Sequence, residues 1–152
     1  MFSKFKRLYF ISAVTAVFLT AAGGTAQAED FILVVNSANP IAAGGDTKTV
    51  IKRLYLKQMS EWPHGEKSIV FDREPDSAAY QGFIASVLGM SQAELDDHWL
   101  RLKQTTGDTP PRSVGSARIL VRQIEKNAGA LSYMPASEAE DLGEGVRILL
   151  KF

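Results

Sequence analysis

IVFDREPDSAAYQGFIASVLG, residues 69–89, predicts a short strand that leads through a charged turn into a helix. Its first three residues are apolar and rich in β-branched side chains, as in a buried strand. Pro75 suits the first position of a helix, Asp76 or Ser77 can cap the helix start, and Gly89 can end the helix. One apolar face of this helix contains Tyr80, Phe83, Ile84, Val87 and Leu88.

The turn in this stretch combines features of an anion-binding site. A helix start offers free N–H groups, Ser77 offers a hydroxyl and Arg73 offers a guanidinium. An alternative remains open for each side chain. Arg73 can instead form an ordinary ion pair with Asp72, Glu74 or Asp76, and Ser77 can serve as a helix cap alone.

Residues 1–28 have the pattern of a cleavable signal peptide. Lys4, Lys6 and Arg7 form a basic start, an apolar run follows, and Ala26-Gln27-Ala28 supplies the small residues of a cleavage site. The alternative is a membrane anchor, but the apolar run is shorter than the ~20 residues of a spanning helix. We therefore expect a periplasmic or secreted protein with one domain, residues 29–152.

Strands and helices are expected to alternate along this domain. Such alternation is typical of an α/β sandwich with a largely parallel sheet, and an apolar first strand at 31–35 fits a strand that is covered on both faces. Ser91-Gln-Ala-Glu94 is a capping box, and residues 105–115 predict a surface loop. The other predicted strands are 69–71, 130–134 and 146–150, and the other predicted helices begin near Thr47 and Ala117.

In parallel sheets, ligands bind beyond the carboxyl ends of the strands. This rule predicts that residues 36–39, 72–77 and 133–136 form one edge of a cleft. Asn36 and Ser37 are candidate ligands there, although turn formation also explains them. Tyr133 either lines the cleft or packs in the core.

Several classes of function are disfavoured by composition and motifs. Loss of the signal peptide removes three of the 17 basic residues and leaves 14 against 17 acidic ones, which gives no support for nucleic-acid binding. The chain has no cysteine, His64 and His98 lack partners at zinc-site spacing, and no nucleophile or P-loop motif is present. We expect no metal site, no cofactor and no enzymatic activity.

An ordered series of segments resembles the phosphate-binding proteins of ABC transporters, and more closely the small, single-lobe periplasmic proteins related to them. The series extends over most of residues 31–150. It consists of VVNSANP at 34–40, LYLKQMSEWPHG at 54–65, VLGMS at 87–91, Trp99, Pro110-Pro111 and GALSY at 129–133.

The resemblance implies a fold and a function. The fold is a single lobe of a type II periplasmic-binding-protein fold, with a largely parallel sheet flanked by helices. In the family, one lobe contributes an arginine followed four residues later by serine, glycine and threonine. Arg73 and Ser77 have this spacing, whereas Ala78 and Ala79 replace the glycine and threonine and offer only backbone N–H groups.

Weak or partner-dependent binding of inorganic phosphate or a related oxyanion, in association with ABC-type transport, is therefore expected. Closure of two lobes is not expected from a chain of this length. The alternative is a module of the same fold that has lost the ligand and docks on a membrane transporter or sensor. Neither the identity of the partner nor the oligomeric state follows from the sequence.

Overall fold

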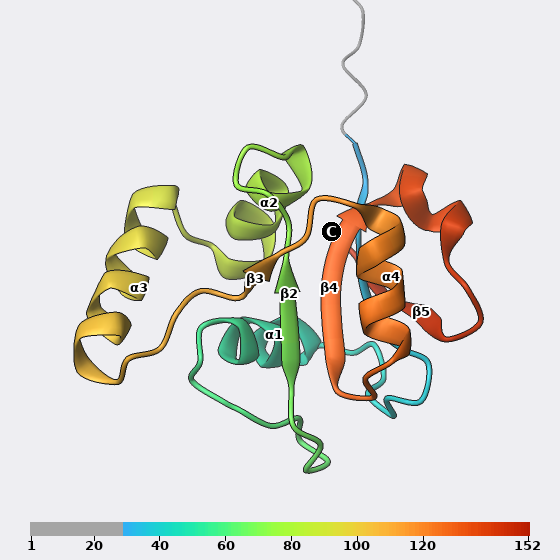
Figure 1. Cartoon of the computed structure of the whole chain (residues 1–152), viewed down its shortest axis with the longest axis horizontal. Coiled ribbons are helices and arrows are strands. Elements are labelled where there is room, and N and C mark those ends of the chain that lie inside the picture. The colour runs from blue at the N-terminus through green and yellow to red at the C-terminus, as the bar shows by residue number, and fades with distance from the viewer. Residues whose placement is uncertain (1–28) are drawn as a thin grey trace, which may run out of the picture.

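A computed structural model describes residues 29–152 as a five-stranded sheet between two layers of helices (Figure 1). The predicted signal peptide lies outside the described residues. The strands are β1 (Phe31–Asn36), β2 (Ile69–Asp72), β3 (Arg112–Ser113), β4 (Ala130–Pro135) and β5 (Val146–Lys151). The helices are α1 (Thr47–Tyr55), α2 (Ala78–Phe83), a π-helical continuation η1 (Ile84–Leu88), α3 (Gln92–Thr105), α4 (Ala117–Glu125) and the 3-10 segment η2 (Ala136–Asp141).

The strand order is β3-β2-β4-β1-β5. Strand β2 pairs in parallel with β3 and β4, whereas β1 is antiparallel to both β4 and β5. Four of the five strands therefore run in the same direction, and the predicted α/β fold with a largely parallel sheet is confirmed. The first strand is covered on both faces as expected, but it runs against the other four.

Two separate cores lie on the two faces of the sheet. Alternate residues of β1 explain the division: Leu33 and Val35 belong to the core that also contains residues of α1, α2 and α3, while Ile32 and Val34 belong to the core that contains residues of α4. Figure 1 shows α1 behind the sheet and α4 in front of it. Helix α4 contributes Leu120, Val121 and Ile124 to the second core, and their spacing puts all three on one face of the helix.

The predicted helix of residues 69–89 begins later than its proline indicates. Ser77 is the N-cap, and α2 starts at Ala78, so Pro75 lies in the turn before the helix. The predicted apolar face is confirmed, because all five of its residues are buried. Gly89 ends η1 in the left-handed conformation with φ 62°, which glycine adopts without strain.

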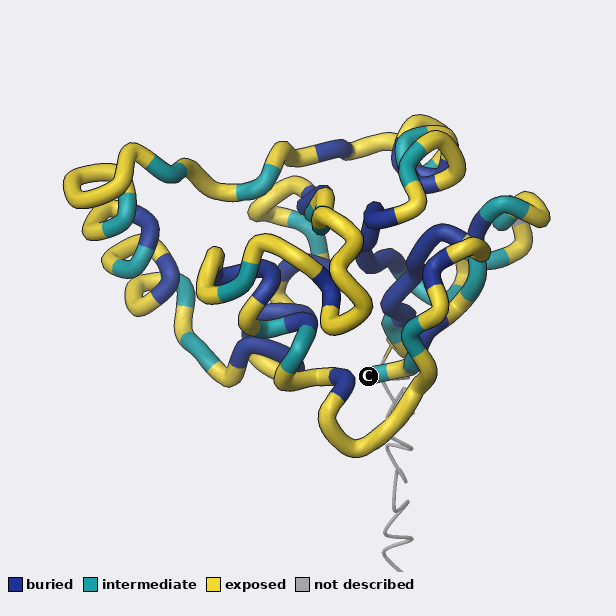
Figure 2. Tube along the Cα trace, turned by 90° about the horizontal axis from the view of Figure 1, so that it is seen from below, coloured by how far each residue is buried: buried dark blue, intermediate teal, exposed yellow. Residues whose placement is uncertain are grey.

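Helix α3 begins with the capping box predicted from the sequence. The Ser91 side chain accepts from the Glu94 N–H, and the Glu94 carboxylate accepts from the Ser91 N–H. Leu95 and Trp99 face the core. The following connection to α4 is the predicted surface loop, and Figure 2 shows it as a mostly exposed strap along one side of the molecule. The loop also contributes the short strand β3, which the sequence does not predict.

Candidate functional site

The turn after β2 directs two neighbouring charged side chains to opposite faces of the sheet. Asp72 ends β2 on the face covered by α1, where its carboxylate accepts hydrogen bonds from Tyr55 and Tyr133. Arg73 points to the other face, where it meets Glu138 of η2. Both residues are buried. The predicted anion site and the buried carboxylate are therefore adjacent in sequence and separated in space.

Arg73 forms its ion pair with a residue that the sequence does not indicate. Its Nη2 lies 3.3 Å from Oε1 of Glu138, and the Arg73 side chain is only 7% exposed. An ion pair, the alternative to anion binding, does form, but with Glu138 and not with Asp72, Glu74 or Asp76. Arg73 Nε and Nη1 are buried and have no hydrogen-bond partner among residues 29–152.

Ser77 acts as the helix cap. Its Oγ accepts from the Tyr80 N–H at 3.2 Å and donates to the carbonyl of Glu74 at 2.7 Å. Ala78 is exposed and Ala79 is buried. Their N–H groups belong to the first turn of α2, where a helix has no internal acceptors for them.

Asn36 and Ser37 lie at the opposite edge of the sheet from this turn. Strand β1 runs antiparallel to β4, so Val35 pairs with Leu131 at the start of β4, while Phe31 pairs with Pro135 at its end. The expectation that Asn36, Ser37 and Arg73 share one cleft is therefore wrong. The Asn36 side chain instead binds the end of α4, where its Nδ2 donates to the carbonyls of Ile124 and Glu125.

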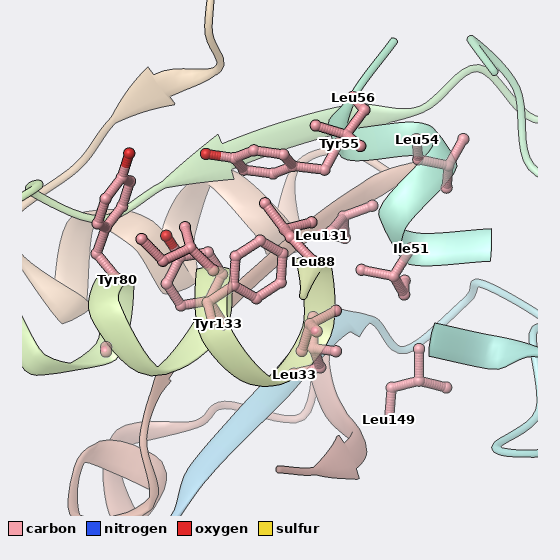
Figure 3. Close-up of a cluster of buried hydrophobic side chains, with 14 of the residues drawn as sticks. Leu33, Ile51, Leu54, Tyr55, Leu56, Tyr80, Leu88, Leu131, Tyr133 and Leu149 are labelled. Atoms are coloured by element: carbon pink, nitrogen blue, oxygen red, sulfur yellow. The ribbon is translucent and has the colours of Figure 1, made fainter. Parts of the chain in front are cut away.

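A buried network around Asp72 is the part of the site that sequence reasoning misses. Asp72 is 3% exposed and accepts hydrogen bonds from the Tyr55 and Tyr133 hydroxyls and from the Arg73 N–H. Figure 3 shows Tyr55, Tyr80 and Tyr133 within the cluster of apolar side chains on this face. An acidic residue directly after a buried strand is the signal available in the sequence, but nothing there identifies its tyrosine partners.

Burial changes the acid–base properties of this network. Loss of hydration raises the pKa of Asp72 above its ordinary 3.8, although the hydrogen bonds from Tyr133, Tyr55 and the Arg73 N–H oppose the increase. Burial and the nearby Asp72 carboxylate also raise the pKa of Tyr55 and Tyr133. Both tyrosines are therefore protonated hydrogen-bond donors at neutral pH.

The raised pKa of Asp72 predicts a pH-dependent stability difference between the protein and Asp72→Asn. Above pH 3.8 the unfolded chain loses this proton first, so the folded state binds more protons. The contribution of Asp72 to the free energy of unfolding is fully present below that pH and is lost as the pH rises through the folded-state pKa of Asp72. Urea unfolding from about pH 4 to about pH 7 should show the wild type losing stability relative to Asp72→Asn. If the stability of the wild type relative to Asp72→Asn stayed constant or grew as the pH rose, the prediction would be contradicted.

Each of the two histidines contacts a neighbouring residue of the protein. His98 Nε2 lies 3.0 Å from the carbonyl oxygen of Leu56, and the His64 ring stacks on Trp62 with centroids 6.2 Å apart. Within the described part of the chain, no group of three or more His, Asp or Glu side chains is arranged to hold a metal ion. None of the helices in residues 29–152 is long and apolar enough to span a bilayer.

Comparison with solved structures identifies the class of fold. An ABC-type phosphate transport receptor from Vibrio cholerae matches with a TM-score of 0.57 and 17% identity, over 80% of this chain and 46% of the receptor. PstS from Borrelia burgdorferi matches with a TM-score of 0.59 and 16% identity, over the same shares of the two chains. No family model and no curated protein sequence matches.

The chain therefore has the fold of one lobe of an ABC-transporter phosphate-binding protein. It spans less than half the length of these receptors. The resemblance predicted from the sequence is confirmed, and at these identities it establishes the fold.

Proposed function

We propose that this protein is a periplasmic, single-lobe relative of phosphate-binding proteins that binds phosphate or a related oxyanion weakly at residues 73–79. One observation carries the proposal: Arg73 presents two buried guanidinium nitrogens without a partner among the described residues, in the turn that leads to the start of α2. Buried donors of this kind are rarely left unpaired in proteins. The match to phosphate receptors in fold supports an anion as the missing acceptor.

The local chemistry limits the affinity. A charge-assisted hydrogen bond contributes roughly 1.5–3 kcal/mol, so the two unpartnered nitrogens of Arg73 give about millimolar to micromolar binding. Glu138 competes for the guanidinium, and the Ser77 hydroxyl already has two partners within the turn.

Export and the transporter partner belong to the same proposal. The predicted signal peptide at 1–28 supports delivery to the periplasm. The fold of ABC-type phosphate receptors supports a membrane transporter as the protein that receives the anion or completes the site.

Calorimetric titration of the purified protein with phosphate, sulfate and arsenate tests the proposal. We expect a dissociation constant in the millimolar to micromolar range for phosphate, and an Arg73→Ala variant that binds at least about tenfold more weakly, the factor for loss of about 1.4 kcal/mol. Arg122→Ala is the matched control, because it removes the same charge from an exposed position on α4. Absence of heat with wild-type protein at about 20 mM anion, or equal weakening by both variants, would contradict the proposal.

A second candidate function is that of an interaction module without a ligand, docking on a membrane transporter or sensor. The observation that favours it is that the polar side chains of the turn already have partners within the protein. Glu138 forms an ion pair with Arg73, and Ser77 caps α2. Cross-linking in the periplasm distinguishes the two. A retained membrane partner together with no anion binding supports the module, while a strictly monomeric protein with no partner argues against it.

A further inference from the structure

A pocket of about 360 Å³ opens on the face of the sheet that carries Asp72. It lies between the end of β2, helix α3 and the strap that joins α3 to α4, and it is separate from the Arg73 side chain on the other face. We call it the aromatic–acidic pocket. Its lining residues are Tyr55, Asp72, Pro75, Tyr80, Gln92, Asp96, Trp99, Pro110, Pro111 and Ser113.

The charge of this pocket is negative. Among the described residues that line it, Asp72 and Asp96 are the ones that carry a charge. Asp72 is buried, and Asp96 is exposed on α3. Two carboxylates without a lining cation repel phosphate and attract a positively charged group.

The walls of the pocket are suited to an organic cation. Tyr80 and Trp99 are 6% and 7% exposed and present aromatic surface, and the proline pair 110–111 adds apolar surface from the strap. A cation over an aromatic face is attracted by the negative face of the ring quadrupole, most strongly for tryptophan. The pocket can therefore bury an apolar body while its carboxylates hold the charge.

Two polar atoms of the lining residues lack partners within the described chain. Gln92 Nε2 donates to Asp96 Oδ1 at 2.7 Å and to the Tyr80 hydroxyl at 3.3 Å. Because a carboxylate only accepts, this bond fixes the orientation of the amide. Gln92 Oε1 and Trp99 Nε1 are then buried without partners. Gln92 Oε1 needs a hydrogen-bond donor, and Trp99 Nε1 needs an acceptor.

We propose that the aromatic–acidic pocket binds a small amine that also carries an oxygen acceptor, such as an amino alcohol with an apolar body. Its ammonium group supplies donors to Asp96 and to Gln92 Oε1, and its oxygen accepts from Trp99 Nε1. The pocket offers two carboxylates, and residues 29–152 contain no group of three or more His, Asp or Glu side chains arranged to hold a metal ion. The proposal is independent of anion binding at Arg73.

Titration with phenylalaninol, and with phenylpropanol as its neutral counterpart, tests the proposal by calorimetry and by NMR of the indole N–H signals. We expect phenylalaninol to bind at least about fivefold more tightly than phenylpropanol, the factor for loss of one partly exposed ion pair. The chain has two tryptophans. The Trp99 signal should shift on binding, whereas Trp62, whose Nε1 donates to the Gly129 carbonyl at 2.9 Å, should not.

Asp96→Asn should weaken phenylalaninol binding by about fivefold. Asp97→Asn is the matched control, because it makes the same change at the next exposed residue of α3, which does not line the pocket. Both positions are exposed, so both variants should fold, and circular dichroism checks this. Equal binding of the two probes, no binding of phenylalaninol, a shift of the Trp62 signal alone or equal loss in both variants would overturn the proposal.

Discussion

Replacement of Asp72 by alanine is expected to lower the free energy of unfolding by about 3–5 kcal/mol. The Tyr55 and Tyr133 hydroxyls both donate to this carboxylate, and both tyrosines are 1% exposed or less. Removal of the acceptor leaves two buried donors unpaired, each at a cost of about 1–3 kcal/mol. The cavity left by the side chain adds to this loss. Urea unfolding monitored by circular dichroism measures the effect.

Two variants separate this hydrogen-bond effect from the loss of charge. Asp72→Asn keeps an acceptor and similar volume, so it should cost much less than alanine. Asp76→Ala removes a carboxylate from an exposed position in the same turn and should change stability by less than about 0.5 kcal/mol. If Asp72→Ala proved as mild as Asp76→Ala, the tyrosine network would have no role in stability.

Replacement of Phe83 by alanine should have an effect of similar size, about 3–5 kcal/mol. Phe83 is fully buried and stacks on Tyr133 with ring centroids 4.1 Å apart and an interplanar angle of 4°. It also contacts the Tyr55 ring at a centroid distance of 5.0 Å. The substitution therefore leaves a cavity beside both tyrosines that hold Asp72. Thermal and urea unfolding measure the loss.

Phe83→Leu is the control for packing volume. It fills most of the space but loses the aromatic stack, which contributes about 0.5–1.5 kcal/mol beyond burial, so its cost should fall well below that of alanine. Because Phe83 supports Tyr133, the alanine variant should also couple with Asp72→Ala in a double-mutant cycle. Fully additive effects would show that the stack does not position the network.

Local sequence patterns predicted the main elements of this fold. The helical period in residues 80–88 identified the buried face of α2 and η1, because side chains three or four residues apart share one side of a helix. The capping box at Ser91 identified the start of α3 because its two hydrogen bonds are made within four residues. Strand β3 was not predicted, since two exposed residues in a loop become a strand only through pairing with β2.

The candidate site was predictable only in part. Arg73 and Ser77 were located because their spacing is local, and the capping role of Ser77 follows from neighbouring backbone groups. Glu138 lies 65 residues from Arg73, and Tyr133 lies 61 residues from Asp72. No periodicity connects residues so far apart, so the ion pair and the buried carboxylate network required the tertiary structure.

The sequence by itself determined that residues 69–89 form a strand, a charged turn and a helix, because apolar spacing, a serine cap and a terminal glycine act over a few residues. It also indicated the α/β class through the alternation of such segments. Only the tertiary structure decided the direction of β1, which moves Asn36 and Ser37 to the far edge of the sheet. It likewise decided that Asp72 and Arg73 face opposite layers, because a pleated strand sends successive side chains to opposite faces and the packed layers supply their partners.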